Sequence, residues 1–239
     1  MTVKIVNLIT DLIYPPRCSV CDEIIPGFGK GICKECKGKL TYVQEPYCMK
    51  CGKPIENEEK ELCSDCERKN HNYDEGRSVF IYDEYMSRSI YRFKYNSKKE
   101  YALFYGEEIS KSLGMKIKSW NPDALIPVPI HKSKLKKRGF NQAYLIAKEI
   151  SKNLNIPIND KILIRKNQTK VQKNLGAKER ENNLKKAFNV KKNSVKLNTV
   201  VIIDDIYTTG STIDAISTVL KESGVKKVYF ITLSIGRGI

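Results

Sequence analysis

The sequence lacks any long apolar run, and no stretch approaches the roughly 18 residues that a membrane span needs. A secretion signal is not expected either. Residues 1–13 form a short amphipathic segment with Asp11 inside it and no small-residue cleavage site, and Pro15 and Pro16 end that segment. The 239 residues, of which 41% are hydrophobic, suffice for one mid-sized domain and a smaller one. We therefore expect a soluble, cytoplasmic protein.

Two widespread phosphate-binding signatures are missing as well. The chain contains no G-x-x-x-x-G-K-[ST] loop and no G-x-G-x-x-G motif after a strand. Nucleotide hydrolases of the P-loop type and dinucleotide-binding domains of the Rossmann type are therefore not expected.

A different phosphate site is predicted at residues 200–212. The apolar residues 200–203 are typical of a parallel strand buried on both faces, and apolar positions at helical spacing follow the loop. Backbone N–H groups at the start of a helix can hold a phosphate, while paired acids suit ribose hydroxyls or a hydrated Mg²⁺. Glycine in the loop allows close approach to a ligand. The candidate binding residues are Asp204, Asp205, Thr208, Thr209, Gly210, Ser211 and Thr212.

An ordinary strand-turn-helix junction is the plainer interpretation, with Thr209 or Ser211 as a helix N-cap. Capping accounts for one hydroxyl, not for two acids and four hydroxyls within thirteen positions. The stretch resembles the signature that binds phosphoribosyl pyrophosphate (PRPP) in type I phosphoribosyltransferases. That resemblance implies a ligand that is PRPP or another ribose phosphate, bound with Mg²⁺.

Cysteine occurs only in pairs, because four C-x-x-C motifs repeat at a period of 15 residues and use all eight cysteines. Each motif can place two thiolates on one tetrahedral ion, so we expect two structural zinc sites rather than disulfides or a redox or Fe–S centre. Sequential pairing makes two zinc ribbons and interleaved pairing a cross-brace; the tandem spacing favours ribbons. His71 is a weak candidate for a substitute ligand. The expected zinc ligands are Cys18, Cys21, Cys33, Cys36, Cys48, Cys51, Cys63 and Cys66.

Charge is distributed unevenly along the chain. Lys and Arg number 43 against 27 Asp and Glu, yet residues 1–75 hold 11 basic and 13 acidic side chains. Residues 131–192 hold 18 basic residues and only four acids. A basic run is usually a solvated surface, but this one flanks the predicted phosphate site, which favours polyanion binding. The acidic cysteine-rich segment is more suited to a structural or protein-binding role.

The middle of the chain alternates strand and helix patterns, which predicts a parallel α/β sheet. Strands are expected near 79–82, 124–129, 162–165, 187–190 and 227–233, and helices near 86–93, 101–113 and from 139–142 onward. The predicted buried helix positions are Leu103, Phe104, Ile109, Leu113, Ala143, Ile146, Ala147 and Ile150. We divide the chain into an N-terminal helix with a double zinc ribbon, residues 1–75, and a second domain, residues 76–239. On that division, Cys48→Ser should unfold the ribbon and leave the phosphate site largely intact.

The whole chain resembles the ComF/GntX family. The motifs that carry this resemblance are Pro127-Val-Pro129-Ile-His131, Arg138-Gly-Phe-Asn-Gln142, Thr169-x-x-Gln172-x-x-Leu175, Arg180-x-x-Asn183, Ala187-Phe188 and residues 204–212. Family members join a zinc ribbon to a type I phosphoribosyltransferase-like domain, a parallel sheet flanked by helices. The family is associated with natural competence, in the handling of incoming single-stranded DNA.

The resemblance also implies roles for residues. Asp204, Asp205 and Arg180 are the candidate catalytic residues, and Arg138 belongs to the segment expected to contact the pyrophosphate. A lid is expected within residues 166–182. Glutamine-dependent transfer of ammonia is excluded without a partner, because no cysteine is left to act as the glutaminase nucleophile.

Two functions remain open at this point. One is a PRPP-binding factor in DNA uptake, with single-stranded DNA held by residues 132–138 and 166–186 and competence proteins bound through the ribbon. The other is a small-molecule transferase that uses a nucleobase or ammonia as acceptor.

Overall fold

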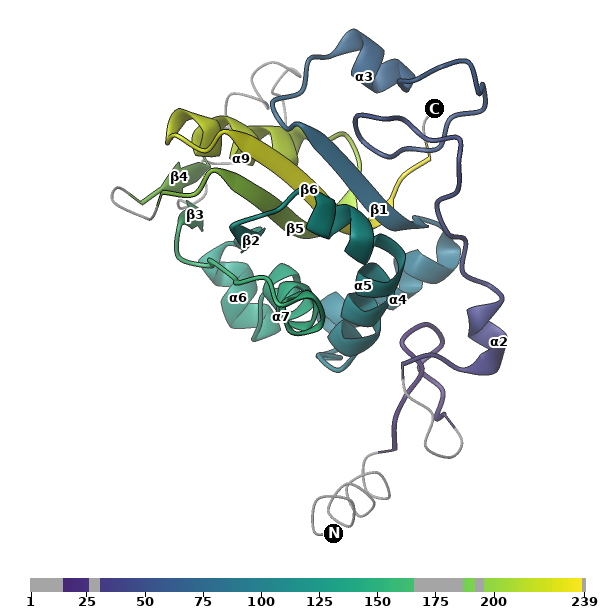
Figure 1. Ribbon diagram of the computed structural model, residues 1–239. Coiled ribbons are helices and arrows are strands. Elements are labelled where there is room, and N and C mark those ends of the chain that lie inside the picture. Colours follow the sequence, from purple (N-terminus) through teal and green to yellow (C-terminus); the bar gives the residue numbers. More distant parts are fainter. Residues whose placement is uncertain (1–14, 26–30, 166–186, 192–195, 238–239) are drawn as a thin grey trace, which may run out of the picture.

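The structure is a computed structural model that describes residues 15–25, 31–165, 187–191 and 196–237 (Figure 1). The expected helix at residues 1–13, the expected lid with Arg180 and the basic stretch 166–186 lie outside these residues.

A four-stranded parallel sheet forms the centre of the molecule, with strand order β1-β6-β5-β2. The strands are β1 (Glu75–Ile81), β2 (Ala124–Pro127), β5 (Thr199–Tyr207) and β6 (Lys227–Ile235). Their register pairs Val201 with Leu125 on one side and with Tyr229 on the other. The sheet confirms the α/β class, and each of its strands overlaps a predicted one, although β1 begins at Glu75, four residues before the predicted start.

Helices cover both faces of this sheet (Figure 1). Alternate residues of β5 face opposite sides: Val201 and Ile203 pack with α4 (Glu84–Tyr95), α5 (Tyr101–Ser119) and α7 (Gln142–Leu154), whereas Val200 and Ile202 pack with α9 (Ser211–Glu222). No helix within the described ranges is long and apolar enough to cross a membrane.

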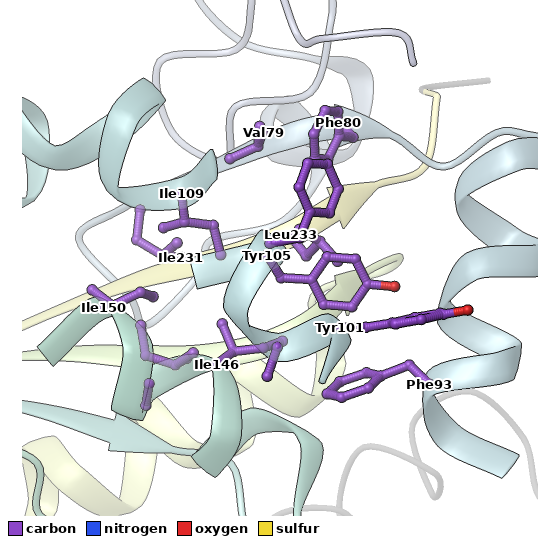
Figure 2. Packing of buried hydrophobic residues seen from close by; sticks show 14 of the residues in the cluster. Val79, Phe80, Phe93, Tyr101, Tyr105, Ile109, Ile146, Ile150, Ile231 and Leu233 are labelled. Atoms are coloured by element: carbon purple, nitrogen blue, oxygen red, sulfur yellow. The ribbon is translucent and has the colours of Figure 1, made fainter. Parts of the chain in front are cut away.

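Figure 2 shows the core on the first face, where aromatic rings from α4 and α5 meet aliphatic side chains of β1, β6 and α7. Phe93 and Tyr105 pack edge to face with their ring centroids 5.2 Å apart. The predicted buried positions are confirmed with two exceptions. Leu103 is 39% exposed because it lies on the outer side of α5, and Leu113 is half-buried.

Smaller elements surround the sheet. The short helix α6 (Lys132–Arg138) follows β2, and β3 (Leu163–Arg165) pairs antiparallel with β4 (Phe188–Val190). In the N-terminal part, α2 (Lys34–Lys37) and α3 (Ser64–Arg68) each begin directly after a cysteine, Cys33 or Cys63. The bridges Arg17–Ile24 and Tyr47–Pro54 occupy equivalent places before them. The four C-x-x-C motifs therefore belong to two copies of one structural unit, each with two motifs, and the copies are 30 residues apart.

Candidate functional site

The eight cysteines form two groups of four, and in each group the sulfur atoms lie within 4.8 Å of one another. The groups follow the sequence: Cys18, Cys21, Cys33 and Cys36 make the first ribbon, and Cys48, Cys51, Cys63 and Cys66 make the second. This arrangement is the sequential pairing.

The spacing of the sulfur atoms fits zinc. Sγ–Sγ distances of 3.8 Å between Cys21 and Cys33 and 3.6 Å between Cys51 and Cys63 match the roughly 3.8 Å expected between ligands about 2.3 Å from a tetrahedral Zn²⁺. No cysteine forms a disulfide. Backbone N–H groups of Val20 and Cys33 donate to Cys18 Sγ, each at 3.4 Å, and such bonds stabilise thiolate ligands. His71 belongs to neither group.

The predicted phosphate loop lies between the carboxyl end of β5 and the start of α9. Gly210 has φ +74° and is the N-cap of that helix, so the loop turns through the left-handed region. A Cβ atom at this position would lie 2.5 Å from the Tyr207 hydroxyl oxygen. The hydroxyls of Thr209 and Ser211 are 2.9 Å apart and exposed to a small hollow of about 40 Å³. The loop therefore offers backbone N–H groups and hydroxyls at a helix N-terminus.

The two acids of β5 point to opposite faces of the sheet. Asp205 is only 4% exposed and forms an ion pair with Lys94 of α4. Asp204 is partly exposed, and its Oδ1 accepts a hydrogen bond from the backbone N–H of Asp205 at 2.9 Å. Desolvation, together with the neighbouring Asp205, raises the pKa of Asp204 well above its usual range. Lys94 balances the charge of Asp205, and the raised pKa of Asp204 favours its neutral form. The two acids directly precede Tyr207 and the phosphate loop, where their oxygen atoms are candidates for contact with ribose hydroxyls.

Two cations beside these acids escaped the sequence analysis. Lys94 lies more than a hundred positions before Asp205, and Arg165 of β3 approaches Asp204 from the other face. Burial lowers the pKa of the Arg165 guanidinium, and the charge of Asp204 opposes this effect. The aromatic pattern around Lys94 predicts a packed helix and gives no sign of the contact, which only the tertiary fold creates.

Arg138, which was expected to contact pyrophosphate, is the last residue of α6. Its Nη1 donates to Gln142 Oε1, and its guanidinium lies 5.3 Å from the centroid of the Tyr95 ring. Arg138 Nε is buried and has no hydrogen-bond partner among the described atoms. The donor is thus available to an anion that enters beside α6.

The second ribbon and the segment after it contact Tyr207, the residue that directly precedes the phosphate loop. The hydroxyls of Tyr73, which follows this ribbon, and Tyr207, the last residue of β5, lie 2.7 Å apart and are both buried. Lys53 of the ribbon pairs with Asp65 at 2.6 Å, and its Nζ lies 5.9 Å from the Tyr207 ring centroid.

A buried polar network adds a second connection between the ribbon and α9. His71 Nδ1 lies 2.5 Å from Asp214 Oδ2, and Asp214 Oδ1 accepts from the backbone N–H of Asn72 at 2.9 Å. Although burial acts in the opposite direction, these bonds and Lys69 hold the pKa of Asp214 below its ordinary value. We therefore revise the expectation that Cys48→Ser would leave the phosphate site largely intact.

A larger hollow of about 610 Å³ lies elsewhere, against the second ribbon, and its lining includes Tyr42, Ile55, Leu62 and Arg237. It has neither the paired acids nor the hydroxyl loop. The larger hollow therefore lacks the groups that the sequence predicts for a phosphate site, and residues 204–212 have them.

Comparisons with known domain families agree with this assignment. Residues 9–67 match the family described as double zinc ribbon domain, and residues 134–237 match the one described as phosphoribosyl transferase domain. Fold and site thus define a phosphoribosyltransferase-like domain that carries a double zinc ribbon.

Curated proteins similar to this chain have names that refer to competence and DNA utilization. The chain is 41% identical over 109 residues to "Competence protein F" of Haemophilus influenzae, covering 45% of this chain and 48% of that protein. It is 32% identical over 151 residues to "Competence protein ComFC" of Bacillus subtilis (63% and 59% covered) and 29% identical over 154 residues to "DNA utilization protein YhgH" of Salmonella typhi (63% and 67%). The matched part spans about half to three fifths of the first two relatives. The chain is thus similar to curated proteins named for competence and DNA utilization.

Proposed function

We propose that this protein binds PRPP together with Mg²⁺ at the carboxyl end of β5. The observation that carries the proposal is the order of groups there: a buried parallel strand, the paired acids, a hydroxyl loop turned by Gly210 and the N-terminus of α9. The backbone N–H groups of residues 208–212 would hold the 5′-phosphate, and the positive end of the helix dipole favours that charge.

The acids and Arg138 have separate roles in this proposal. Asp204 and Asp205 would accept hydrogen bonds from the ribose hydroxyls, since a ribose lying across the end of β5 meets both faces of the strand. Arg138 would donate to the pyrophosphate, and Arg180, outside the described residues, is the candidate for closing the site. Mg²⁺, when bound, supplies positive charge that stabilises pyrophosphate as it leaves C1 of the ribose.

Asp205→Asn tests the ligand. Because the substitution removes the charge from two charge-assisted hydrogen bonds, PRPP binding should weaken by roughly 2 to 4 kcal/mol in calorimetry with Mg²⁺. Asp160→Asn, an exposed acid remote from the loop, is the matched control and should bind PRPP as the wild type does. Melting temperatures of both variants separate lost binding from lost folding, since Asp205 also pairs with Lys94. A wild type that binds no PRPP or ribose phosphate contradicts the proposal.

We further propose that single-stranded DNA is the macromolecular partner, in keeping with the competence and DNA utilization names of the relatives. The support on this chain is α6, in which Lys132, Lys134, Lys136 and Lys137 are all exposed and none joins a described salt bridge. Binding through phosphates should be salt-sensitive and weakly sequence-specific. The cytoplasm is the expected location, and competence proteins are the expected partners of the ribbon.

A small-molecule transferase with a nucleobase or ammonia acceptor is the alternative, and the intact acid pair favours ligand binding in both cases. Pyrophosphate release from PRPP, measured with acceptor pools and with single-stranded DNA, separates the two. The division into residues 1–75 and 76–239 stays a working proposal; β1 begins at Glu75, next to that boundary.

A further inference from the structure

Helix α4 presents two tyrosines to the outside while its opposite side is buried. Tyr91 is 61% exposed and Tyr95 is 56% exposed, whereas Ile90 and Phe93 are at most 2% exposed. The two rings are one helical turn apart, with centroids 4.9 Å from each other and planes tilted by 46°. Among the large hydrophobic side chains of the described residues, only Met115 is more exposed. Exposed aromatic rings that lie together on a surface are typical of a binding site for a partner that stacks on them.

The surroundings of this pair carry positive charge. The Arg138 guanidinium lies 5.3 Å from the Tyr95 ring centroid, which connects the pair to the C-terminal end of α6 and its exposed lysines. On the same helix, Lys94 lies between the tyrosines in sequence and forms the ion pair with Asp205. The tyrosine pair therefore lies beside the C-terminal end of the basic helix α6, on the helix whose Lys94 contacts the acid pair.

We propose that Tyr91 and Tyr95 form a base-stacking platform for single-stranded DNA, whose phosphates lie along α6; this inference rests on the DNA partner proposed above. Exposed aromatic rings beside a row of cationic side chains are the combination that binds single-stranded nucleic acid, because bases stack on the rings and phosphates pair with lysine and arginine. The positive charge disfavours a basic protein as the occupant. A strand bound in this way runs past the PRPP site.

Binding of a fluorescent oligothymidine to the full chain tests the platform. Tyr91→Ala and Tyr95→Ala should each weaken binding roughly 5- to 150-fold, since one stacked base contributes about 1 to 3 kcal/mol. Tyr91→Phe and Tyr95→Phe keep the ring and should bind within about twofold of the wild type. Tyr85→Ala is the matched control. Tyr85 is on the same helix, about 120° from Tyr91 and about 80° from Tyr95 around the helix axis, so its loss should change DNA affinity little.

Two further arms distinguish stacking from charge. An abasic oligonucleotide of the same length keeps the phosphates but offers no bases, so the wild type and the alanine variants should bind it equally. The salt slope of oligothymidine binding should be unchanged by the alanine variants and reduced by Lys136→Ala with Lys137→Ala.

The outcomes are separable. A wild type that binds no single-stranded DNA overturns the proposed partner and, with it, the platform. A wild type that binds, with alanine variants of equal affinity, overturns the platform alone. Alanine variants that lose self-association or RNA binding while keeping their DNA affinity also overturn it.

Discussion

The two zinc ribbons carry the same four-cysteine set and yet belong to opposite sides of the molecule. The first ribbon joins the hydrophobic core that α4, α5 and α7 form on one face of the sheet. The second ribbon joins the core on the other face, together with Tyr73, Tyr207, Ile213 and Phe230. A sequence repeat thus fixes the metal ligands, whereas the structural role of each copy depends on the surface that it meets.

The contacts of the first ribbon lead to α4. Ser89 and Arg92 of this helix donate to the carbonyl oxygens of Ser19 and Val20, and Asp22 accepts from Tyr101 at 2.7 Å. This ribbon therefore supports the helix that carries Lys94, while the second supports the phosphate loop itself through Tyr207 and α9. We therefore expect that loss of zinc from the second ribbon affects the phosphate loop more than loss of zinc from the first ribbon.

Loss of one ligand from each ribbon should give the largest contrast. Cys66→Ser should lower the PRPP affinity by at least about tenfold more than Cys36→Ser. A structural zinc contributes on the order of 10 kcal/mol to its fold, and within the described part of the chain it is the second ribbon that reaches Tyr207, the residue before the loop. Calorimetry with Mg²⁺ measures the affinities, and elemental analysis counts the zinc ions left. Equal losses would mean that the ribbons act through global stability.

Asp214 tests the buried network beside the second ribbon. Asp214→Asn should reduce the free energy of unfolding by roughly 2 to 4 kcal/mol near pH 7, because His71 and Asn72 lose a charged acceptor. A carboxyl whose folded pKa is depressed stabilises the fold above its unfolded value of about 4 and loses this contribution as the pH falls through the folded pKa. The difference from the wild type in chemical denaturation should therefore shrink below about pH 4. A pH-independent difference contradicts this origin.

The hydroxyl pair of Tyr73 and Tyr207 should have a moderate effect. Each single change to Phe leaves one buried hydroxyl without its partner and should cost about 1 to 2 kcal/mol. The double variant should cost hardly more than either single one, and the coupling energy follows from the double-mutant cycle. Strict additivity of the two costs would show that the contact does not couple the ribbon to the loop.

Asp22 of the first ribbon should give the smallest effect. Its ion pair with Lys98, 2.8 Å long, is partly exposed, so Asp22→Asn should cost about 0.5 to 1 kcal/mol of stability. Asn tolerates the left-handed backbone at this position, where φ is +71°. PRPP affinity should stay within about twofold of the wild type, and a larger loss would place the first ribbon in the site.

Local patterns predicted much of this molecule. The apolar run 200–203, the cysteine period and the helical spacing of Ala143, Ile146 and Ile150 each depend on neighbours in the chain, and the structure confirms all three. Lys94 and Arg165 could not be found in this way, because their partners are far away in sequence.

The contacts of the second ribbon with β5 and α9 could not be predicted either, because they also join residues that are far apart in sequence. His71 was considered only as a zinc ligand, since its partner Asp214 is 143 positions away. Leu103 shows the converse error. Its local apolar pattern predicts a buried residue, but the core does not reach this side of α5 and Leu103 is exposed.

Hydrogen exchange of the ligand-free phosphate loop tests the central claim most directly. We expect the backbone amides of residues 208–214 to exchange faster in Cys66→Ser than in the wild type, and to be nearly unchanged in Cys36→Ser. Among the described residues, the second ribbon and the segment 69–73 directly after it contact Tyr207 and Asp214, and the first ribbon does not. This readout does not depend on PRPP. Equal protection of the loop in both variants would contradict the claim that the second ribbon holds the phosphate site in place.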